Sequence, residues 1–277
     1  MTEKKITFQG AAIFYRTVGE GKTVVLVHGF GEDSNIWDYQ VEFLKAHFHI
    51  ILPDIPGSGR SEIVPNANIE TYAEIMKAIL DNEGTTSKLQ ETESVTMIGH
   101  SMGGYITLAF AKKYPEQLNS FGLFHSTAFA DTEEKKQVRA KAIDFINEKG
   151  SNVFLKTSTP ALFTKAFAEK YPERINELIE KGEKFTAEAL VQYYKAMISR
   201  PDRTDVLKTF SSPILFIIGQ HDMAIPLESS LQQCYLPAQS HVNLLEKSAH
   251  MGMWEETEKC NQILRQFLQY VSFGNDK

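Results

Sequence analysis

A serine between two glycines, in the segment Gly-His-Ser-Met-Gly at residues 99–103, is the strongest sign of chemistry in this chain of 277 residues. A continuous apolar run at 95–98 precedes it, and a stretch of helical periodicity at 102–113 follows. Flanking glycines lack the Cβ atoms that would block a sharp strand-to-helix turn, so the serine hydroxyl stands exposed where a helix begins. A helix N-terminus stabilises negative charge. The segment therefore predicts that Ser101 is a nucleophile; the alternative is that Ser101 only caps the helix.

A serine hydroxyl needs a base to take its proton, and that base needs a third group to orient it. Of eight histidines, His250 lies between the last apolar run (242–245) and the last helical stretch (256–270). Such a loop emerges at the carboxyl edge of a parallel sheet, where ligands bind. His250 is the predicted base, with an exposed or capping histidine as the alternative. His100 lies inside the serine turn and faces away if Ser101 faces out.

The third group must be a carboxylate that follows a strand at the same edge. Asp222 does so, four residues after the apolar run 214–218. The order Ser101, Asp222, His250 is a known chain order for a serine triad. Asp222 is therefore the predicted acid.

Three other carboxylates fit less well. Asp54 lies among prolines, which indicates a structural turn. Asp131 and Glu133 come too late after the apolar run at 121–124.

The negative charge that develops on a substrate oxygen needs two N–H donors aimed at it. The residue after the nucleophile supplies one, which predicts the Met102 amide. The glycine-containing loop after an early apolar run, residues 28–31, offers the other through the Phe30 amide. The glycines of that loop also suit a tight turn, which is compatible with both roles.

Alternating elements must position these residues. The first 20 residues alternate like a hairpin with a turn at Gln9 and Gly10, and apolar runs follow at 23–27, 49–52, 95–98, 121–124, 214–218 and 242–245. Continuous apolar runs indicate strands buried on both faces, as in parallel sheets. Helix-period stretches lie between them at 36–46, 69–82, 102–113 and 256–270. This alternation predicts an α/β fold.

The alternation breaks once, between residues 131 and 206, where the sequence is helical throughout. We therefore expect a catalytic core of residues 1–130 and 207–277, with residues 131–206 inserted as an all-helical cap.

Five motifs in sequence order make the chain resemble the α/β hydrolases, as a serine hydrolase of the carboxylesterase kind with a helical cap. They lie at 28–31, 53–61, around Ser101, at 219–222 and at 249–250. The resemblance implies a mainly parallel eight-stranded sheet flanked by helices, a cap inserted after the sixth strand, and Phe30 as the second oxyanion donor. Ser58 departs from the histidine that many relatives carry in that turn. Dehalogenases and epoxide hydrolases of the family use an aspartate nucleophile, so Ser101 argues against both.

Composition narrows the function further. A net charge of −6 argues against nucleic acid as a partner, because phosphate binding needs a basic face. The N-terminus has no apolar signal segment, the apolar runs are too short to span a bilayer, and two cysteines cannot form a disulfide framework. We expect a cytoplasmic monomer or homodimer that acts on a small molecule, with no cofactor and no metal, since neither a His-Glu-x-x-His motif nor a zinc-like cluster occurs.

The expected reaction is cleavage of a small hydrophobic carboxylic ester through an acyl-enzyme on Ser101. The substrate pocket is expected to include His125, Met223, Met251 and Trp254. Five cap phenylalanines, at positions 145, 154, 163, 167 and 185, either add to the pocket or pack the cap on the core. The resemblance leaves other functions open: a lactone, thioester or C–C bond hydrolase, a cofactor-free perhydrolase, an aminopeptidase, or a ligand receptor on a hydrolase shell.

Overall fold

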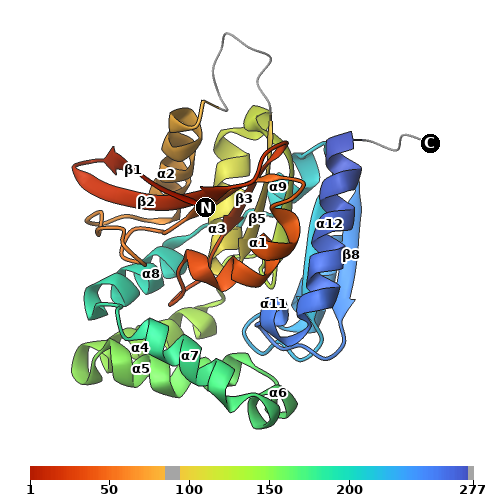
Figure 1. The fold of residues 1–277 in the computed structure, drawn as a ribbon. Coiled ribbons are helices and arrows are strands. Elements are labelled where there is room, and N and C mark those ends of the chain that lie inside the picture. Colours follow the sequence, from red (N-terminus) through yellow and green to blue (C-terminus); the bar gives the residue numbers. More distant parts are fainter. Residues whose placement is uncertain (85–93, 274–277) are drawn as a thin grey trace.

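The computed structural model describes residues 1–84 and 94–273, and it confirms an α/β fold around one eight-stranded sheet (Figure 1). Its strands lie in the order β1-β2-β4-β3-β5-β6-β7-β8, with β1 and β2 antiparallel to their neighbours and the other strands parallel. The strands are β1 (Thr2–Phe8), β2 (Ala11–Val18), β3 (Thr23–Val27), β4 (His49–Pro53), β5 (Val95–His100), β6 (Leu118–Phe124), β7 (Ile214–Gly219) and β8 (Ser240–Leu245).

Both faces of the sheet are covered. Alternate residues of β3 enter two separate apolar cores: Val25 and Val27 join one, and Val24 and Leu26 join the other. This two-sided burial explains why the central strands are continuous apolar runs. The first core is closed by α2 (Ile69–Asn82) and α3 (Met102–Lys113), and the second by α1 (Asp38–Leu44) and α12 (Thr257–Phe273). Short helical segments complete this part: η1 (Ser34–Trp37), η2 (Pro115–Gln117), α10 (Leu227–Cys234) and α11 (Gly252–Glu255).

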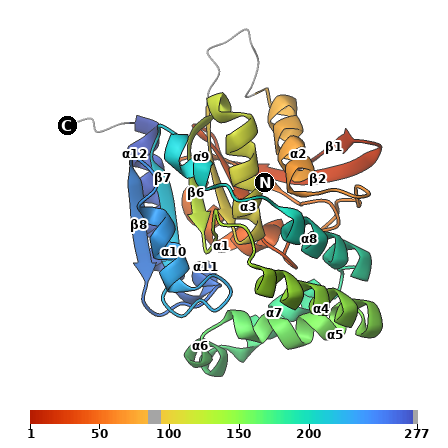
Figure 2. The same ribbon diagram turned by 180° about the vertical axis from the view of Figure 1, so that it is seen from behind.

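Between β6 and β7 the chain forms only helices. They are α4 (Glu133–Lys149), α5 (Ser151–Ser158), η3 (Thr159–Leu162), α6 (Lys165–Lys170), α7 (Pro172–Gly182), α8 (Ala187–Ser199) and α9 (Thr204–Thr209). A threonine hydroxyl accepts a hydrogen bond from an amide in the first turn of three of them, at Thr132, Thr164 and Thr186. Helices α4 to α7 form a layer at one end of the sheet (Figures 1 and 2).

The end of the inserted segment lies with the core. Helix α9 contacts α3, whereas the predicted cap boundary at residue 206 falls inside α9. We therefore propose that the cap consists of α4 to α8. Helix α8 joins the cap to the core, since the Tyr193 hydroxyl donates to the Pro56 carbonyl at 2.8 Å.

The turn between β5 and α3 is held by direct contact of backbone with backbone. Ser101 has φ 51° and ψ −116°, a conformation that side chains disfavour. A Cβ on Gly99 would lie 2.2 Å from the Gly103 carbonyl oxygen, and one on Gly103 would lie 2.3 Å from the Val27 carbonyl oxygen. Helix α3 can therefore start against β3 and β5 only because both positions are glycine.

Replacement of Gly103 by alanine is expected to destabilise the fold by about 3 kcal/mol or more, because the new methyl group meets rigid backbone. Urea unfolding of Gly103→Ala and wild type measures the difference. Gly10→Asn is the matched control: no atom lies within 4 Å of its Cβ position, and asparagine tolerates its positive φ of 86°. A Gly103→Ala protein as stable as the control would contradict this account of the turn.

Candidate active site

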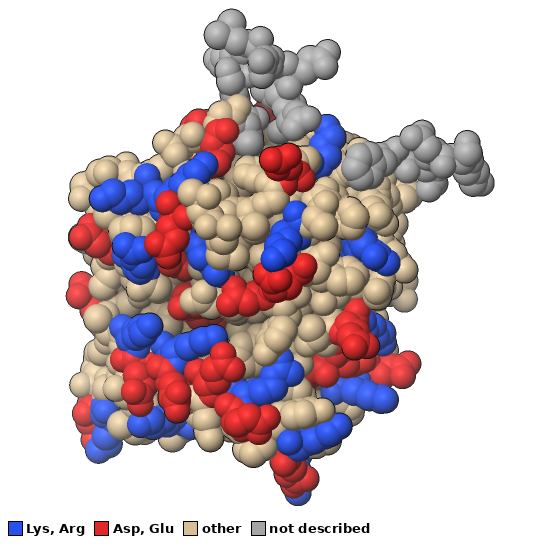
Figure 3. Space-filling model, in the orientation of Figure 1, with Lys and Arg blue, Asp and Glu red and all other residues tan. Residues whose placement is uncertain are grey.

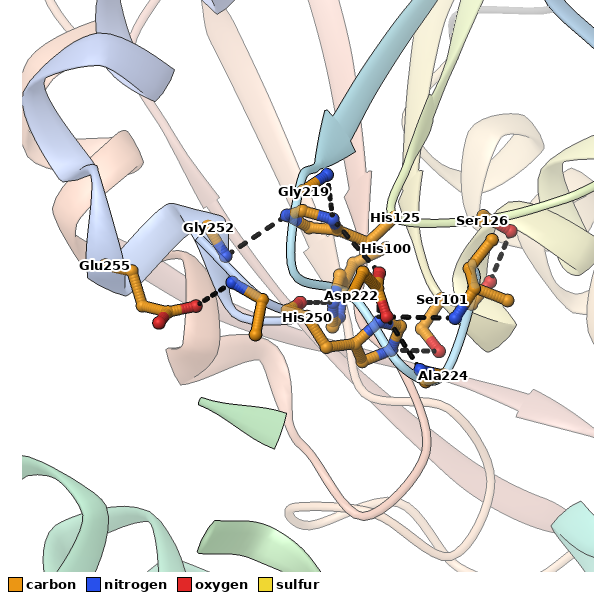
Figure 4. A network of polar contacts seen from close by, with 12 residues as sticks. His100, Ser101, His125, Ser126, Gly219, Asp222, Ala224, His250, Gly252 and Glu255 are labelled. Atoms are coloured by element: carbon orange, nitrogen blue, oxygen red, sulfur yellow. Dashed lines mark hydrogen bonds and ion pairs between the residues drawn. The ribbon is translucent and has the colours of Figure 1, made fainter. Parts of the chain in front are cut away.

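Three side chains from distant parts of the chain form one chain of hydrogen bonds at the carboxyl edge of the sheet (Figure 4). His250 Nε2 lies 2.9 Å from Ser101 Oγ, and His250 Nδ1 lies 2.8 Å from Asp222 Oδ2. The carboxylate fixes the proton on Nδ1, so that Nε2 presents a lone pair to the serine hydroxyl. The residues predicted as nucleophile, base and acid are thus brought together in bonding geometry.

The Asp222 carboxylate is held from both sides. Its Oδ1 accepts hydrogen bonds from the backbone amides of Ala224 and Ile225, at 2.8 and 2.9 Å. Burial alone raises the pKa of Asp222, but the electrostatic attraction of His250 and the hydrogen bonds of His125 and His250 together outweigh burial and hold the pKa well below its usual range. The carboxylate is therefore ionised at neutral pH.

The two amides predicted as oxyanion donors border Ser101. Met102 is the first residue of α3, where amide N–H groups lack partners within the helix. A Cβ on Gly29 would lie 3.1 Å from Ser101 Cβ, so the loop that carries Phe30 runs directly against the serine. The Phe30 ring stacks on Tyr194 of α8 at 4.4 Å between centroids, which ties this loop to the cap.

His100 faces away from the cavity, as predicted, and makes a buried ion pair. Its Nδ1 lies 3.0 Å from Glu32 Oε2, and its Nε2 lies 3.0 Å from the His250 carbonyl oxygen. Both ring nitrogens meet acceptors, so both carry protons and the ring is charged. Burial lowers the pKa of His100, but the charge and hydrogen bond of Glu32, the hydrogen bond to the His250 carbonyl and the Asp222 charge together outweigh burial and raise the pKa above its ordinary value. Burial raises the pKa of Glu32, but His100, the Gly29 amide and His28 together outweigh burial and lower it.

A cavity of about 1070 Å³ opens onto Ser101 and His250. Most of its wall is apolar or aromatic and comes from both the core and the cap, including Phe30, Tyr105, Phe129, Leu162, Tyr194, Met197 and Ile225. Met223, predicted for the pocket, lines this cavity and is 85% exposed.

The other three predicted pocket residues do not line this cavity, so those three predictions are wrong. His125 is buried behind Asp222, with Nδ1 3.3 Å from Oδ2. Met251 belongs to the second apolar core, because the loop turns inward directly after His250. Trp254 is buried in the same core and donates its indole N–H to the Ile36 carbonyl.

The five cap phenylalanines pack the cap rather than line the cavity. Phe163 and Phe167 stack on each other, and Phe163 packs against Trp254. Phe154 packs edge-on against Phe30 and also contacts Phe145, and Phe185 belongs to the first apolar core.

A charged cluster in the cavity wall was not predicted. Asp131 accepts from Arg139 at 2.6 Å and from Arg200 at 2.9 Å, and Arg200 also lies 3.8 Å above the Tyr105 ring. Burial raises the pKa of Asp131, but the two guanidinium groups outweigh burial and lower it. No periodicity links residues 131 and 200, so only the tertiary structure reveals this site.

The cap also contacts the loop that carries His250. The His250 amide donates to the Leu162 carbonyl at 2.9 Å. Glu255 accepts at 2.8 Å from the amides of both Thr164 and Ala249. The position of the histidine is therefore coupled to the position of the cap.

The turn at residues 53–61 is structural, as predicted. Asp54 Oδ1 accepts from the Ser34 amide at 3.0 Å. Ser58, which replaces a histidine of many relatives, bonds to His28 Nε2 at 2.9 Å. These contacts lie outside the cavity wall, so the turn supports the site from behind.

Two further properties concern partners. Among the described residues, no helix is long and apolar enough to cross a membrane. On the face displayed in Figure 3, acidic and basic side chains are intermixed rather than gathered in a basic patch.

Comparisons with known proteins show the family and the fold. A family model described as alpha/beta hydrolase fold matches residues 22–257. A 2-hydroxy-6-oxononadienedioate/2-hydroxy-6-oxononatrienedioate hydrolase of Paraburkholderia phymatum is 24% identical, over 92% of this chain and 90% of that protein. A thermophilic esterase from Thermogutta terrifontis has a TM-score of 0.90 at 28% identity, with 98% and 100% of the two chains covered. An enol-lactonase from Burkholderia xenovorans LB400 shares the fold, with a TM-score of 0.86 at 21% identity over 96% of this chain and 100% of that one.

The buried pair of His100 and Glu32 makes stability depend on pH. The raised His100 pKa adds stability that is complete below the ordinary value of 6.5 and is lost as pH rises through the folded-state pKa. The lowered Glu32 pKa adds stability that is present above 4.5 and is lost as pH falls through its folded-state pKa. The pair therefore contributes most to stability between pH 4.5 and 6.5, the ordinary pKa values of the two groups.

Glu32→Gln is expected to lose about 3 kcal/mol of unfolding free energy near pH 6, with a smaller loss above the folded-state pKa of His100. Urea unfolding at several pH values measures this, and Glu20→Gln, at an exposed position, is the control for the charge change. A loss that does not vary with pH would show that His100 is neutral.

Proposed function

The chain belongs to the α/β hydrolase fold family, and within it we propose a serine hydrolase that cleaves small hydrophobic carboxylic esters. The observation that carries this proposal is the continuous hydrogen-bonded chain from Ser101 through His250 to Asp222, which opens into a mostly apolar cavity. A nucleophile with its base and orienting acid beside an apolar pocket suits acyl transfer from an ester.

The proposed reaction has two steps. His250 Nε2 takes the Ser101 proton as Oγ attacks the substrate carbonyl, and the Phe30 and Met102 amides stabilise the oxyanion. His250 then gives the proton to the departing alcohol. In the second step water, activated by His250, attacks the acyl-enzyme and releases the acid. Asp222 stays ionised throughout and stabilises the imidazolium that forms.

Two of the similar proteins support a carboxylic ester as the substrate class. The Thermogutta protein is described as an esterase and the Burkholderia protein as an enol-lactonase, and both names refer to carboxylic esters. Each similarity supports an oxygen ester or lactone as the substrate class of this chain, but neither specifies the acyl group.

Ser101→Ala is expected to lower kcat for p-nitrophenyl esters by about 10⁶-fold and to abolish labelling by a fluorophosphonate. Asp222→Asn is expected to lower kcat by about 10⁴-fold, because the wrong histidine tautomer then faces the serine. Rates are measured with acyl chains from acetyl to octanoyl, and Ser211→Ala, at an exposed position outside the cavity wall, is the control. Failure of the wild type both to cleave any ester and to be labelled contradicts the proposal. Tight ligand binding with negligible turnover would favour a receptor.

A second candidate is hydrolysis of a C–C bond in a carboxylated oxo compound. One buried aspartate accepts from two arginines in the cavity wall, so one guanidinium charge is not matched within this cluster, although Glu134 and Asp202 lie in the same wall. A substrate carboxylate would balance that charge. The Paraburkholderia relative is named for an oxo-dicarboxylate substrate, which supports this candidate.

Arg139→Gln separates the two candidates, since the Arg139 side chain borders the cavity. If the substrate carries a carboxylate, kcat/KM for an oxo-dienoate falls by about 10-fold or more, while that for a neutral ester changes little. Equal losses for both substrates would mean that Arg139 acts only through the structure of the cap.

A further inference from the structure

We propose that His125 is a positioning residue for the triad: its neutral imidazole donates a hydrogen bond from Nδ1 to Asp222 Oδ2 and fixes the carboxylate that orients His250. This inference rests on the proposed function of the site. His125 does not line the cavity, so it meets no substrate and acts through its contact with Asp222.

The His125 ring is accommodated by an unfavourable backbone conformation and by two neighbouring glycines. His125 follows β6 with a positive φ of 48°, which few histidines adopt. A Cβ on Gly219 would lie 2.8 Å from its Cε1, and one on Gly252 would lie 2.5 Å from its Nε2. Two glycines, one at the end of β7 and one at the start of α11, thus leave a closely fitting space for the imidazole (Figure 4).

The neighbours of the ring select one tautomer. Each ring nitrogen faces a backbone amide that can only donate: the Gly252 amide lies 3.2 Å from Nε2 and the Gly219 amide 3.1 Å from Nδ1. Nδ1 also lies 3.3 Å from the acceptor Asp222 Oδ2, so a proton on Nδ1 meets a carboxylate, whereas a proton on Nε2 would meet the Gly252 N–H. The opposite tautomer would satisfy only the Gly219 amide, 3.1 Å from Nδ1, and would turn a lone pair toward the carboxylate. The charged acceptor therefore decides the tautomer.

The His125 ring stays neutral between pH 5 and 9. Burial is the largest influence and lowers the pKa of His125 to about 4, although Asp222 opposes the shift. A neutral donor orients the carboxylate and shares its charge without cancelling it. Oδ2 thus receives donors from both His125 and His250.

Removing the His125 donor should leave more of the Asp222 charge to stabilise a protonated His250. The acidic limb of a pH–rate profile then moves to higher pH. The groups that face His250 are Ser101, Asp222, His125, and His100 with Glu32 behind it. Besides Glu32, the charged groups in the shared cavity wall are Asp131, Glu134, Lys135, Arg139, Arg200 and Asp202. Only residue 125 changes among the variants. A difference in the acidic midpoint of the pH–rate profile therefore measures the effect of the His125 donor.

Three substitutions distinguish the role of Nδ1 from that of Nε2. His125→Asn keeps an N–H near the Nδ1 position and tolerates the positive φ. His125→Gln reaches toward Gly252 but gives up the donor to Asp222, and His125→Ala removes both. The readout is the rate at which a fluorophosphonate labels Ser101 in the full chain between pH 5 and 9, since this rate requires no knowledge of the substrate.

The Gln and Ala variants are expected to label about tenfold more slowly at pH 7, with the acidic midpoint about one pH unit higher. The Asn variant should retain the wild-type midpoint. If His125→Ala does not fold, the Asn and Gln pair still makes the comparison. Equal midpoints in wild type, Asn and Gln overturn the role of His125, whereas an unlabelled wild type overturns the proposed function as well.

The wild type gives an independent measurement. Nitrogen-15 chemical shifts of His125 should show a protonated Nδ1 and a bare Nε2 throughout pH 5 to 9. A protonated Nε2 overturns the proposal.

Discussion

The site depends on the absence of side chains where α3 meets β3 and β5. A Cβ atom on Gly103 would lie 2.3 Å from the Val27 carbonyl oxygen and 2.6 Å from that of His28. The backbone of the first turn of α3 therefore packs directly against the end of β3, which leads into the loop that carries Phe30. Gly29 in that loop also packs closely: a Cβ atom at this position would lie 3.0 Å from His100 Nδ1 and 3.1 Å from Ser101 Cβ. The serine and both proposed oxyanion donors therefore belong to one rigid unit, and their spacing follows from close packing.

Four buried histidines around this unit differ in charge and tautomer because their neighbours differ. His100 meets two acceptors and is charged, whereas His28 donates to the Gly29 carbonyl and accepts from the Ile55 amide. His250 lies between a carboxylate and a hydroxyl, the arrangement that a general base requires. His125 meets the Gly252 amide at one nitrogen, and the Gly219 amide together with the Asp222 carboxylate at the other. Backbone groups thus set much of the electrostatics of the site.

The sequence predicted what local spacing determines. The bounds of α2 and α3 follow from periodicity, and the loops that carry Ser101, Asp222 and His250 meet because parallel strands end at one edge. It did not predict which way side chains near these loops turn. His125 was expected in the pocket because it follows β6, but two glycines, 94 and 127 residues away, admit its ring to the interior. Similarly, Asp131 is far in sequence from Arg200, and only the packing of α8 over the core brings them together.

The hydrogen bond from the His250 amide to the Leu162 carbonyl bears on how such a protein could be re-engineered. A cap grafted from another scaffold must do more than enclose a cavity of suitable shape. It must present a carbonyl oxygen at the same point, or the histidine loop is left with an unsatisfied buried donor. The junction between the two modules is therefore a shared stretch of main chain, and chimeras that preserve residues 159–164 together with the His250 loop keep that junction whole.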